Sequence, residues 1–298
     1  MMQWKHLLMA GMLLATGVWA QPALTPEAFR SATLDYHASK FFLSADTRVT
    51  QRWLTPEAAA RDWALAGEQG AKGLAAGERT AFISMASDVI GRRSLAQVWL
   101  REDGTALQRT SVRLNHKHRA RLYRFFDGRV LSLKRYPEQG EADQPWPAWS
   151  RVQTEWYKLP DSLIPPVTRG EGLFYLAVAA PLYKPGDQWQ ATLFDSDGPL
   201  VLTLKVEAET PLPVDLTLDG PEGRARLKAS IPTLRIRATA TPIGDRGGEF
   251  SFLGLKGGIT LYLDPQRHLI VRLEGKADVL GEVTIHLQQV RWAGNGLQ

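Results

Sequence analysis

Apolar and polar residues alternate along short segments through most of the chain, most plainly in 259–263, 269–273 and 283–290. Successive side chains of a β-strand point to opposite faces of its sheet, so this period of two predicts strands with one apolar face. The apolar face is expected to hold Ile259, Leu261, Leu263, Val271, Leu273, Val283, Ile285 and Leu287. The opposite face is expected to hold Thr260, Tyr262, Arg272, Glu274, Thr284, His286 and Gln288. One dry face and one wetter face are typical of an antiparallel sheet that is covered on one side.

Four Asp-Gly pairs punctuate these alternating segments. They are Asp103-Gly104, Asp127-Gly128, Asp197-Gly198 and Asp219-Gly220. Both residue types tolerate the positive φ of a tight turn, and the first three pairs therefore predict β-hairpins between short strands of about six to eight residues. The fourth pair predicts a longer connection before the next strand.

Helix signals are few. Thr55-Pro56-Glu57 supplies a helix start before 58–66, a shorter start lies at 25–27, and 161–180 contains apolar residues at helical spacing. The Pro- and Trp-rich stretch 137–166 is predicted to cover the sheet, because nothing in the chain resembles a linker. The sequence therefore predicts a mainly β fold: one large, strongly curved antiparallel sheet, or half-barrel, with one or two covering helices.

The first twenty residues have the pattern of a secretory signal peptide. A short positive start at Lys5 precedes an apolar run from Leu7 to Val18, and Val18 and Ala20 supply the small residues of a cleavage site. No twin-Arg pair is present, so export by the general secretory route to the bacterial periplasm is expected. We therefore divide the chain into a leader, 1–20, and a single β-rich periplasmic domain, 21–298, without a transmembrane segment.

Composition narrows the function classes. The chain has 298 residues, a formal charge of +5 and no cysteine. Without cysteine there is no thiol catalysis, zinc–thiolate site or lipoprotein anchor, and the mild charge gives no case for nucleic acid. Nucleophile-elbow, metalloprotease, phosphate-loop and dinucleotide motifs are absent as well. A non-enzymatic protein without a cofactor is expected.

A basic hairpin between residues 113 and 124 is the most distinctive local feature. Arg119 and Arg121 share one face of a strand that begins at His118, whereas Arg124 points to the other face. Guanidinium groups bind phosphate or carboxylate in a bidentate manner. The candidate ligand-binding residues, for an anionic group, are Arg113, Lys117, Arg119, Arg121 and Arg124. The alternative interpretation is a solvated sheet edge that its positive charge keeps soluble.

Other polar residues have ordinary structural explanations. His116 and His118 lack a third metal ligand, so no metal site is predicted. His286 is expected near Glu274, in a structural hydrogen bond. Asp195 and Asp197 flank a serine at a predicted turn, where aspartate suits the geometry. The three tryptophans of 146–156 are expected to close the sheet core, although they could also form an aromatic surface.

Residues 172–292 resemble a known bacterial periplasmic family on an ordered set of features. These are the apolar 173–182, the Lys184-Pro-Gly-Asp187 turn, the strand 189–194 with its Asp197-Gly198 hairpin, and the pair of segments 257–267 and 281–287. The family is domain of unknown function 3108. The resemblance implies a periplasmic half-barrel like that of the lipoprotein carriers, curled around a helix and an apolar cavity, and it implies no catalytic residue.

These observations lead to two functional hypotheses. The first is a binding or carrier-like protein that holds a hydrophobic or amphiphilic envelope component on the concave side of the sheet. The second is a structural or assembly factor of the cell envelope that acts through protein–protein contacts.

Overall fold

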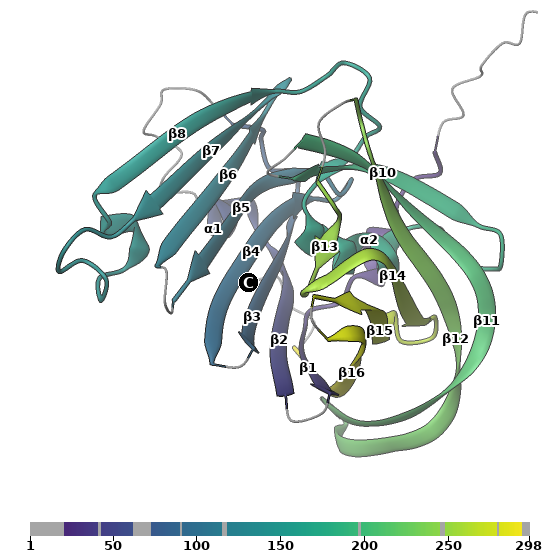
Figure 1. Cartoon of the computed structure of the whole chain (residues 1–298). Coiled ribbons are helices and arrows are strands. Elements are labelled where there is room, and N and C mark those ends of the chain that lie inside the picture. The colour runs from purple at the N-terminus through teal and green to yellow at the C-terminus, as the bar shows by residue number, and fades with distance from the viewer. Residues whose placement is uncertain are drawn as a thin grey trace, which may run out of the picture.

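The structure is a computed structural model, and it describes residues 21–40, 43–61, 73–89, 91–114, 118–195, 198–244, 248–278 and 280–293. One large sheet contains all the strands of these residues (Figure 1). Its strands are β1 (Ala32–Lys40), β2 (Leu43–Leu54), β3 (Thr80–Val89), β4 (Arg92–Arg101), β5 (Ala106–Arg113), β6 (Arg119–Phe126), β7 (Arg129–Tyr136), β8 (Arg151–Lys158), β9 (Val167–Thr168), β10 (Gln188–Asp195), β11 (Gly198–Gly220), β12 (Gly223–Pro242), β13 (Ser251–Phe252), β14 (Leu255–Asp264), β15 (Leu269–Ala277) and β16 (Gly281–Trp292). The α-helices are α1 (Pro56–Arg61) and α2 (Leu173–Ala179), and short 3-10 helices occur at Pro26–Ala28, where a helix start was predicted, Trp146–Ala148 and Gly170–Gly172. The predicted mainly β fold with one or two short helices is confirmed.

Two meanders meet at the first and last strands. Strands β1 to β8 follow one another in chain order, and β1 also pairs antiparallel with β16, from Ala32 opposite Trp292 to Ala38 opposite Ile285. From β16 the order continues through β15, β14, β12, β11 and β10 to β9. The strands curl into an incomplete ring around α2, so β8 and β9 form the two ends of the sheet.

The alternating pattern of the C-terminal strands is confirmed. Among the residues expected on the apolar face, all are buried except Val283, which is half-buried. Among those expected on the polar face, only Thr260 is buried. A one-residue slip in register would move every apolar side chain to the wrong face, and burial of one face therefore fixes the pairing.

The hairpin at Asp219-Gly220 differs from the prediction. Strands β11 and β12 contain 23 and 20 residues, and they continue to a turn of only Pro221 and Glu222, where Gly220 pairs with Gly223. The predictions of short strands and of a longer connection here were wrong. Both strands bend sharply, with a register shift between Val206 and Ala208, and form an arch that curves past β14, β15 and β16 (Figure 1).

Strand β16 is shared by two neighbours along one edge. Its first half pairs with β15, up to His286 opposite Arg272, and its last residues pair in parallel with the tip of β11, from Gln289 opposite Thr217. Between these two pairings, residues Leu287 and Gln288 of β16 have no strand partner on this edge. This topology leaves an opening in the wall of the ring.

Helix α2 fills the interior of the ring. All of its seven residues are buried, and its Tyr175 hydroxyl donates a hydrogen bond to the Glu102 carbonyl oxygen at 2.5 Å. A helix this short is unstable alone in water, so burial against the sheet stabilises it. The helix predicted within 161–180 is confirmed, and it lies beyond Pro165 and Pro166, which would interrupt a helix. Neither α1 nor α2 is long enough to cross a membrane, and no other helix of the described residues could do so.

The outer face of β3 to β7 is covered by short segments. Ala59 of α1 packs against Phe82 and Trp99, and the helix expected over 55–66 is described only as far as Arg61. The Pro- and Trp-rich stretch covers part of this face as predicted, with Trp149 fully buried. However, residues 151–158 of that stretch form strand β8, which the prediction missed, and Trp156 on it is exposed.

Candidate functional site

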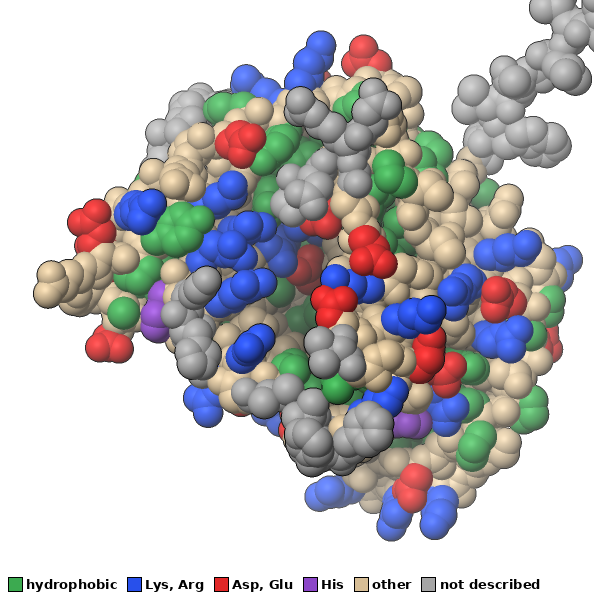
Figure 2. All heavy atoms as spheres, viewed as in Figure 1, with side chains coloured by type: hydrophobic (Ala, Val, Ile, Leu, Met, Phe, Trp, Pro, Cys, Tyr) green, Lys and Arg blue, Asp and Glu red, His purple; other side chains and the backbone are tan. Residues whose placement is uncertain are grey.

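The predicted basic hairpin is formed by β5 and β6. Arg113 lies opposite Arg119, and Arg121 lies opposite Ser111 on one side and Lys134 of β7 on the other. These side chains share the face of Tyr123 and so point to the inner face of the sheet, which α2 also occupies. We call this group, with Arg151 of β8, the arginine face; its members are Arg113, Arg119, Arg121, Lys134 and Arg151. Figure 2 shows Lys and Arg side chains gathered over β5–β7.

Arg124 is not part of the arginine face. Arg124 points to the outer face of β6 and is only 4% exposed, because Gly73 lies against its guanidinium group. Burial lowers the pKa of Arg124 to about 10. Lys117 and His116 lie outside the described residues. The five candidates are therefore divided: three come together, one lies on the opposite face, and one is not described.

Positive charges in the arginine face repel one another. Burial lowers the pKa of Arg119, and the charges of Arg121 and Arg113 lower it further, against a hydrogen bond with Tyr136 that raises it. Glu155 is the nearby carboxylate, 3.9 Å from the Lys134 ammonium group. A bound anion would reduce this repulsion between like charges and raise the pKa of Arg119 again.

Sequence reasoning did not find Lys134 and Arg151. They belong to strands β7 and β8, and cross-strand register places Lys134 beside Arg121, and Tyr136 with Arg151 beside Arg119. The alternation of 129–136 placed Lys134 on a strand, but β8 was not recognised as a strand. The register between two strands cannot be read from the sequence pattern of either one.

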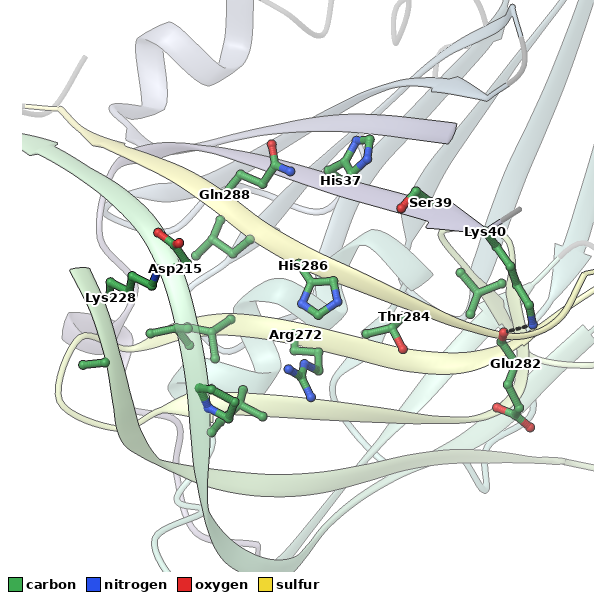
Figure 3. A pocket seen from close by; sticks show the side chains of 17 residues that line it. His37, Ser39, Lys40, Asp215, Lys228, Arg272, Glu282, Thr284, His286 and Gln288 are labelled. Atoms are coloured by element: carbon green, nitrogen blue, oxygen red, sulfur yellow. Dashed lines mark hydrogen bonds between the residues drawn. The ribbon is translucent and has the colours of Figure 1, made fainter. Parts of the chain in front are cut away.

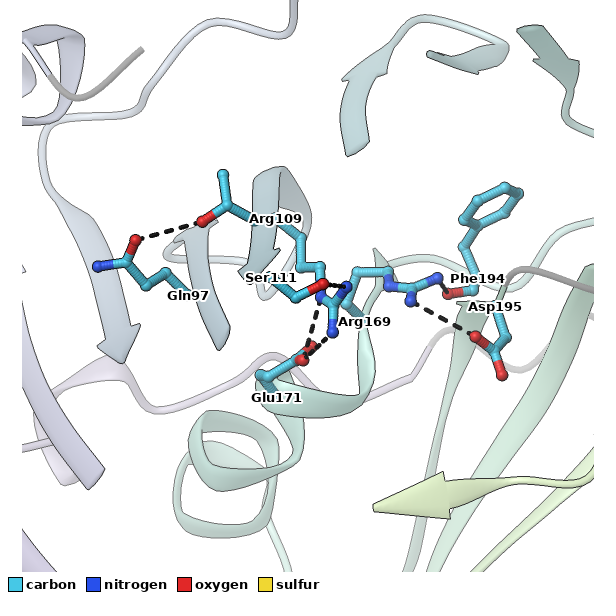
Figure 4. Close-up of polar contacts among 8 residues, drawn as sticks. Gln97, Arg109, Ser111, Arg169, Glu171, Phe194 and Asp195 are labelled. Atoms are coloured by element: carbon cyan, nitrogen blue, oxygen red, sulfur yellow. Dashed lines mark hydrogen bonds and ion pairs between the residues drawn. The ribbon is translucent and has the colours of Figure 1, made fainter. Parts of the chain in front are cut away.

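Two further arginines on the inner face are paired with carboxylates, one with the buried Glu171 and one with the half-buried Asp195 (Figure 4). Arg109 donates to Glu171 Oε1 from Nη2 at 2.7 Å and from Nε at 3.1 Å, and to Ser111 Oγ at 2.6 Å. Arg169 lies 3.4 Å from Asp195 and donates to the Phe194 carbonyl oxygen. These pairs fasten the residues just before α2 to β5 and β10. They are structural contacts, since each charge already has its partner.

The two arginines keep the buried Glu171 carboxyl group ionised. Burial alone raises the pKa of the Glu171 carboxyl group, but the charge and hydrogen bonds of Arg109, with the charge of Arg169, outweigh burial and lower it. Glu171 therefore stays ionised at neutral pH and is part of the fold rather than an acid for catalysis.

The opening between β15, β16 and the arch is a cavity of about 690 Å³, which we call the arch cavity (Figure 3). This volume lies within the range of small-molecule sites. Its lining comes from β1, β11, β12, β15 and β16. The apolar lining residues are Leu212, Pro213, Val214, Ala229, Val271, Val283 and Leu287. The buried ones among them, Leu212, Val271 and Leu287, form a floor that continues into the core.

Polar residues form the rim of the arch cavity. Its cations are Lys40, Lys228 and Arg272, and its carboxylates are Asp215 and Glu282. Asp215 is already held by Arg226, with distances of 2.6 and 2.7 Å. The rim therefore has an excess of positive charge.

Three nitrogen-bearing side chains form a row across the strands at this rim. Arg272 of β15 lies opposite His286 of β16, which lies opposite His37 of β1. Partial desolvation of the imidazole ring lowers the pKa of His286, and the charge of Arg272 lowers it further. Arg272 has one long ion pair, 3.5 Å to Glu274, and its Nε is buried without a hydrogen-bond partner among the described residues. A buried donor of this kind is satisfied by water or by a ligand.

The remaining predicted polar sites are structural or lie outside the described residues. Glu274 accepts a hydrogen bond from the Tyr262 hydroxyl group at 3.0 Å, and it lies opposite Thr284 rather than His286. His118 packs edge-on against Trp149. Asp197 is not described, and no cluster of metal-ligating side chains occurs in the described part of the chain.

Among the described residues, no apolar cavity opens beside α2 on the concave side, where one was expected. Around α2 the inner face is filled by side chains such as Tyr36, Phe174 and Phe252, which contact one another. The arch cavity, lined by strands alone, combines an apolar floor with open space. Comparisons with protein-family models, with curated proteins and with solved structures find no match to this chain.

Proposed function

We propose that the protein is a non-enzymatic binding or carrier-like protein of the bacterial periplasm, which holds an amphiphilic anion of the cell envelope in the arch cavity. The observation that supports this most directly is a cavity of about 690 Å³ with an apolar floor and a cationic rim. Each methylene group of the ligand that is transferred from water to the apolar floor contributes about 0.8 kcal/mol to the binding free energy. A phosphate or carboxylate head group would accept charge-assisted hydrogen bonds from Arg272 and Lys228.

The arginine face provides a second place for an anionic group. It lacks an open apolar floor, because Tyr123, Phe125 and Phe194 close against one another beneath it with ring centroids about 6 Å apart. The arginine face therefore acts only through its charge. It attracts the anionic head groups of a membrane surface, and the ligand is taken up from that membrane.

The periplasmic location rests on residues 1–20, which lie outside the described part. If they are a leader, the protein isolated from the periplasm has an intact mass that corresponds to a chain starting at Gln21. Retention of the full 298-residue mass would contradict this part of the proposal.

The binding experiment uses decyl phosphate as probe and inorganic phosphate as control. Titration calorimetry should show one decyl phosphate per chain and much weaker binding of inorganic phosphate, because the floor contributes only to the alkyl chain. Equal affinities for the two would indicate a free-phosphate site. No binding of decyl phosphate, together with a stable protein partner on purification, would favour the alternative function, a structural or assembly factor of the envelope.

A further inference from the structure

Strand β8 leaves a long edge of the sheet open. It is the last strand of the sheet order, pairs with β7 along its full eight residues, and has no strand on its other side among the described residues. The opposite end of the sheet is β9, with only two residues. Proteins usually protect sheet edges with short strands, prolines, bulges or charged side chains. Strand β9 is short, whereas β8 has eight residues with neither proline nor bulge, and its protection is limited to the charged side chains of Arg151, Glu155 and Lys158.

The outer face of β8 presents two large apolar side chains. Val152 is 42% exposed and Trp156 is 38% exposed, and they are two of only five exposed large apolar residues in the described part of the chain. Their spacing of four residues places both on one face of the strand. Trp156 is held in position by Phe126, with ring centroids 5.0 Å apart, and by the Arg129 guanidinium group 4.5 Å from its ring.

We propose that β8 pairs antiparallel with β8 of a second copy of this chain, about a two-fold axis at Thr154. In this register Val152 lies opposite Trp156 of the second copy, and this apolar pair occurs twice. On the inner face, Arg151 lies opposite Tyr157 and Gln153 lies opposite Glu155 of the second copy. No like charges face each other, and the two β8 edges satisfy each other's backbone groups.

The neighbouring registers are less favourable. An axis at Glu155 places the two Glu155 carboxylates opposite each other, which is destabilising. An axis at Gln153 pairs Arg151 with Glu155 of the second copy, but it moves Trp156 away from Val152. An exposed ion pair contributes only about 0–1 kcal/mol, so burial of the two apolar pairs decides the register.

A two-fold axis perpendicular to the sheet keeps both inner faces on the same side. Arg151 of each copy then lies at the junction, and the two arginine faces become one continuous surface. Seven paired residues on each side, 151–157, form a small interface, so we expect a dissociation constant of roughly 100 µM. Local concentration at a membrane surface would favour the pairing.

Because the chain has no cysteine, single-cysteine variants test the register directly. Thr154→Cys places two thiols opposite each other across the axis, within disulfide reach. Under mild oxidation at about 100 µM, we expect a covalent dimer of Thr154→Cys that forms at least tenfold faster than that of Gln153→Cys or Glu155→Cys. Val152→Cys and Trp156→Cys should cross-link with each other when mixed, and neither should cross-link alone.

Sedimentation of the unmodified protein provides the matching equilibrium measurement. We expect reversible dimerisation that Val152→Lys or Trp156→Lys abolishes, while Val89→Lys, an exposed apolar residue on a paired strand, leaves it unchanged. A monomer at about 500 µM, or cross-linking that is fastest at a position other than 154, would overturn the proposal. Neither outcome bears on decyl phosphate binding, because none of these residues lines the arch cavity.

Discussion

The arch cavity and the arginine face both present excess positive charge, but they differ in what lies beneath it. Below the rim of the arch cavity are the apolar side chains of Leu212, Val271 and Leu287 and about 690 Å³ of space. Below the arginine face is a closed aromatic cluster. Charge alone attracts anions at any surface and is screened by salt, whereas charge above an accessible apolar floor selects amphiphiles. The two regions should therefore respond differently to ligand, salt and mutation.

The largest expected effect follows from filling the arch cavity. Ala229→Trp places a large ring at its lining, and we expect decyl phosphate affinity to fall about 100-fold, corresponding to loss of several buried methylene groups. Ala225→Trp is the matched control, since Ala225 is exposed on the same face of β12, four residues away, and does not line the cavity. Equal affinities of the two variants in calorimetry would contradict a ligand in the arch cavity.

The next effect concerns the rim. Arg272→Gln removes the cation whose Nε has no hydrogen-bond partner among the described residues. We expect decyl phosphate to bind about tenfold more weakly, because the variant loses one charge-assisted hydrogen bond to the head group. Lys228→Gln should cost less, about threefold, because Lys228 is exposed. Arg224→Gln, on the same face of β12 but away from the cavity, is the control and should leave the affinity unchanged.

The arginine face should show the reverse pattern. We expect the double variant Arg119→Gln and Arg121→Gln to bind phosphatidylglycerol vesicles several-fold more weakly than the unmodified protein in co-sedimentation at low salt. The difference should vanish at about 0.5 M salt, where surface charges are screened. Decyl phosphate affinity should be unaltered. The thermal stability of the double variant should be equal or slightly higher, since the substitutions relieve repulsion around Arg119.

The smallest expected effect depends on pH. His286 has a lowered pKa in the folded protein, because of burial and then Arg272, with Glu274 acting in the opposite direction and His37 adding to the lowering. The unfolded imidazole takes up a proton near pH 6.5 and the folded one takes it up at lower pH. The contribution of His286 to stability is therefore complete above pH 6.5 and is lost as pH falls below it.

A bound anion beside His286 would raise its pKa again. We therefore expect decyl sulfate, whose single negative charge does not change between these pH values, to bind about twofold more tightly at pH 5.5 than at pH 7.5, and His286→Gln to remove this difference. Ring-proton chemical shifts of His286, followed with and without the probe, give the pKa directly. A pKa that does not change on saturation would place the head group elsewhere.

The fold could largely be predicted from sequence, and the reason is physical. Alternation with one buried face and Asp-Gly turns are local signals, and they identified the strands from 259 to 290 and the hairpins at Asp103 and Asp127. The long arch could not be predicted, because Pro211 and Pro213 in the polar middle of β11 resemble a break. In the structure both residues lie within the continuous strand β11, and Pro213 lines the arch cavity.

The candidate site was predicted only in part. The basic hairpin gave Arg113, Arg119 and Arg121 from one segment, where the face of each side chain follows from strand parity. The alternation of the strand also placed Arg124 correctly on the opposite face. Its burial could not be predicted, because it depends on Gly73, which is about fifty residues away in the chain. The arch cavity depends on which strands share β16, and that information is in no single segment.

The most direct test of the account is to locate the probe. In methyl-resolved NMR spectra of the unmodified protein, decyl phosphate should shift the methyl signals of Leu212, Val271 and Leu287 and leave those of Leu173 and Leu176 in α2 unchanged. Saturable shifts confined to the first group would establish the arch cavity as the site. Shifts centred on α2, or none at concentrations that saturate binding in calorimetry, would contradict it.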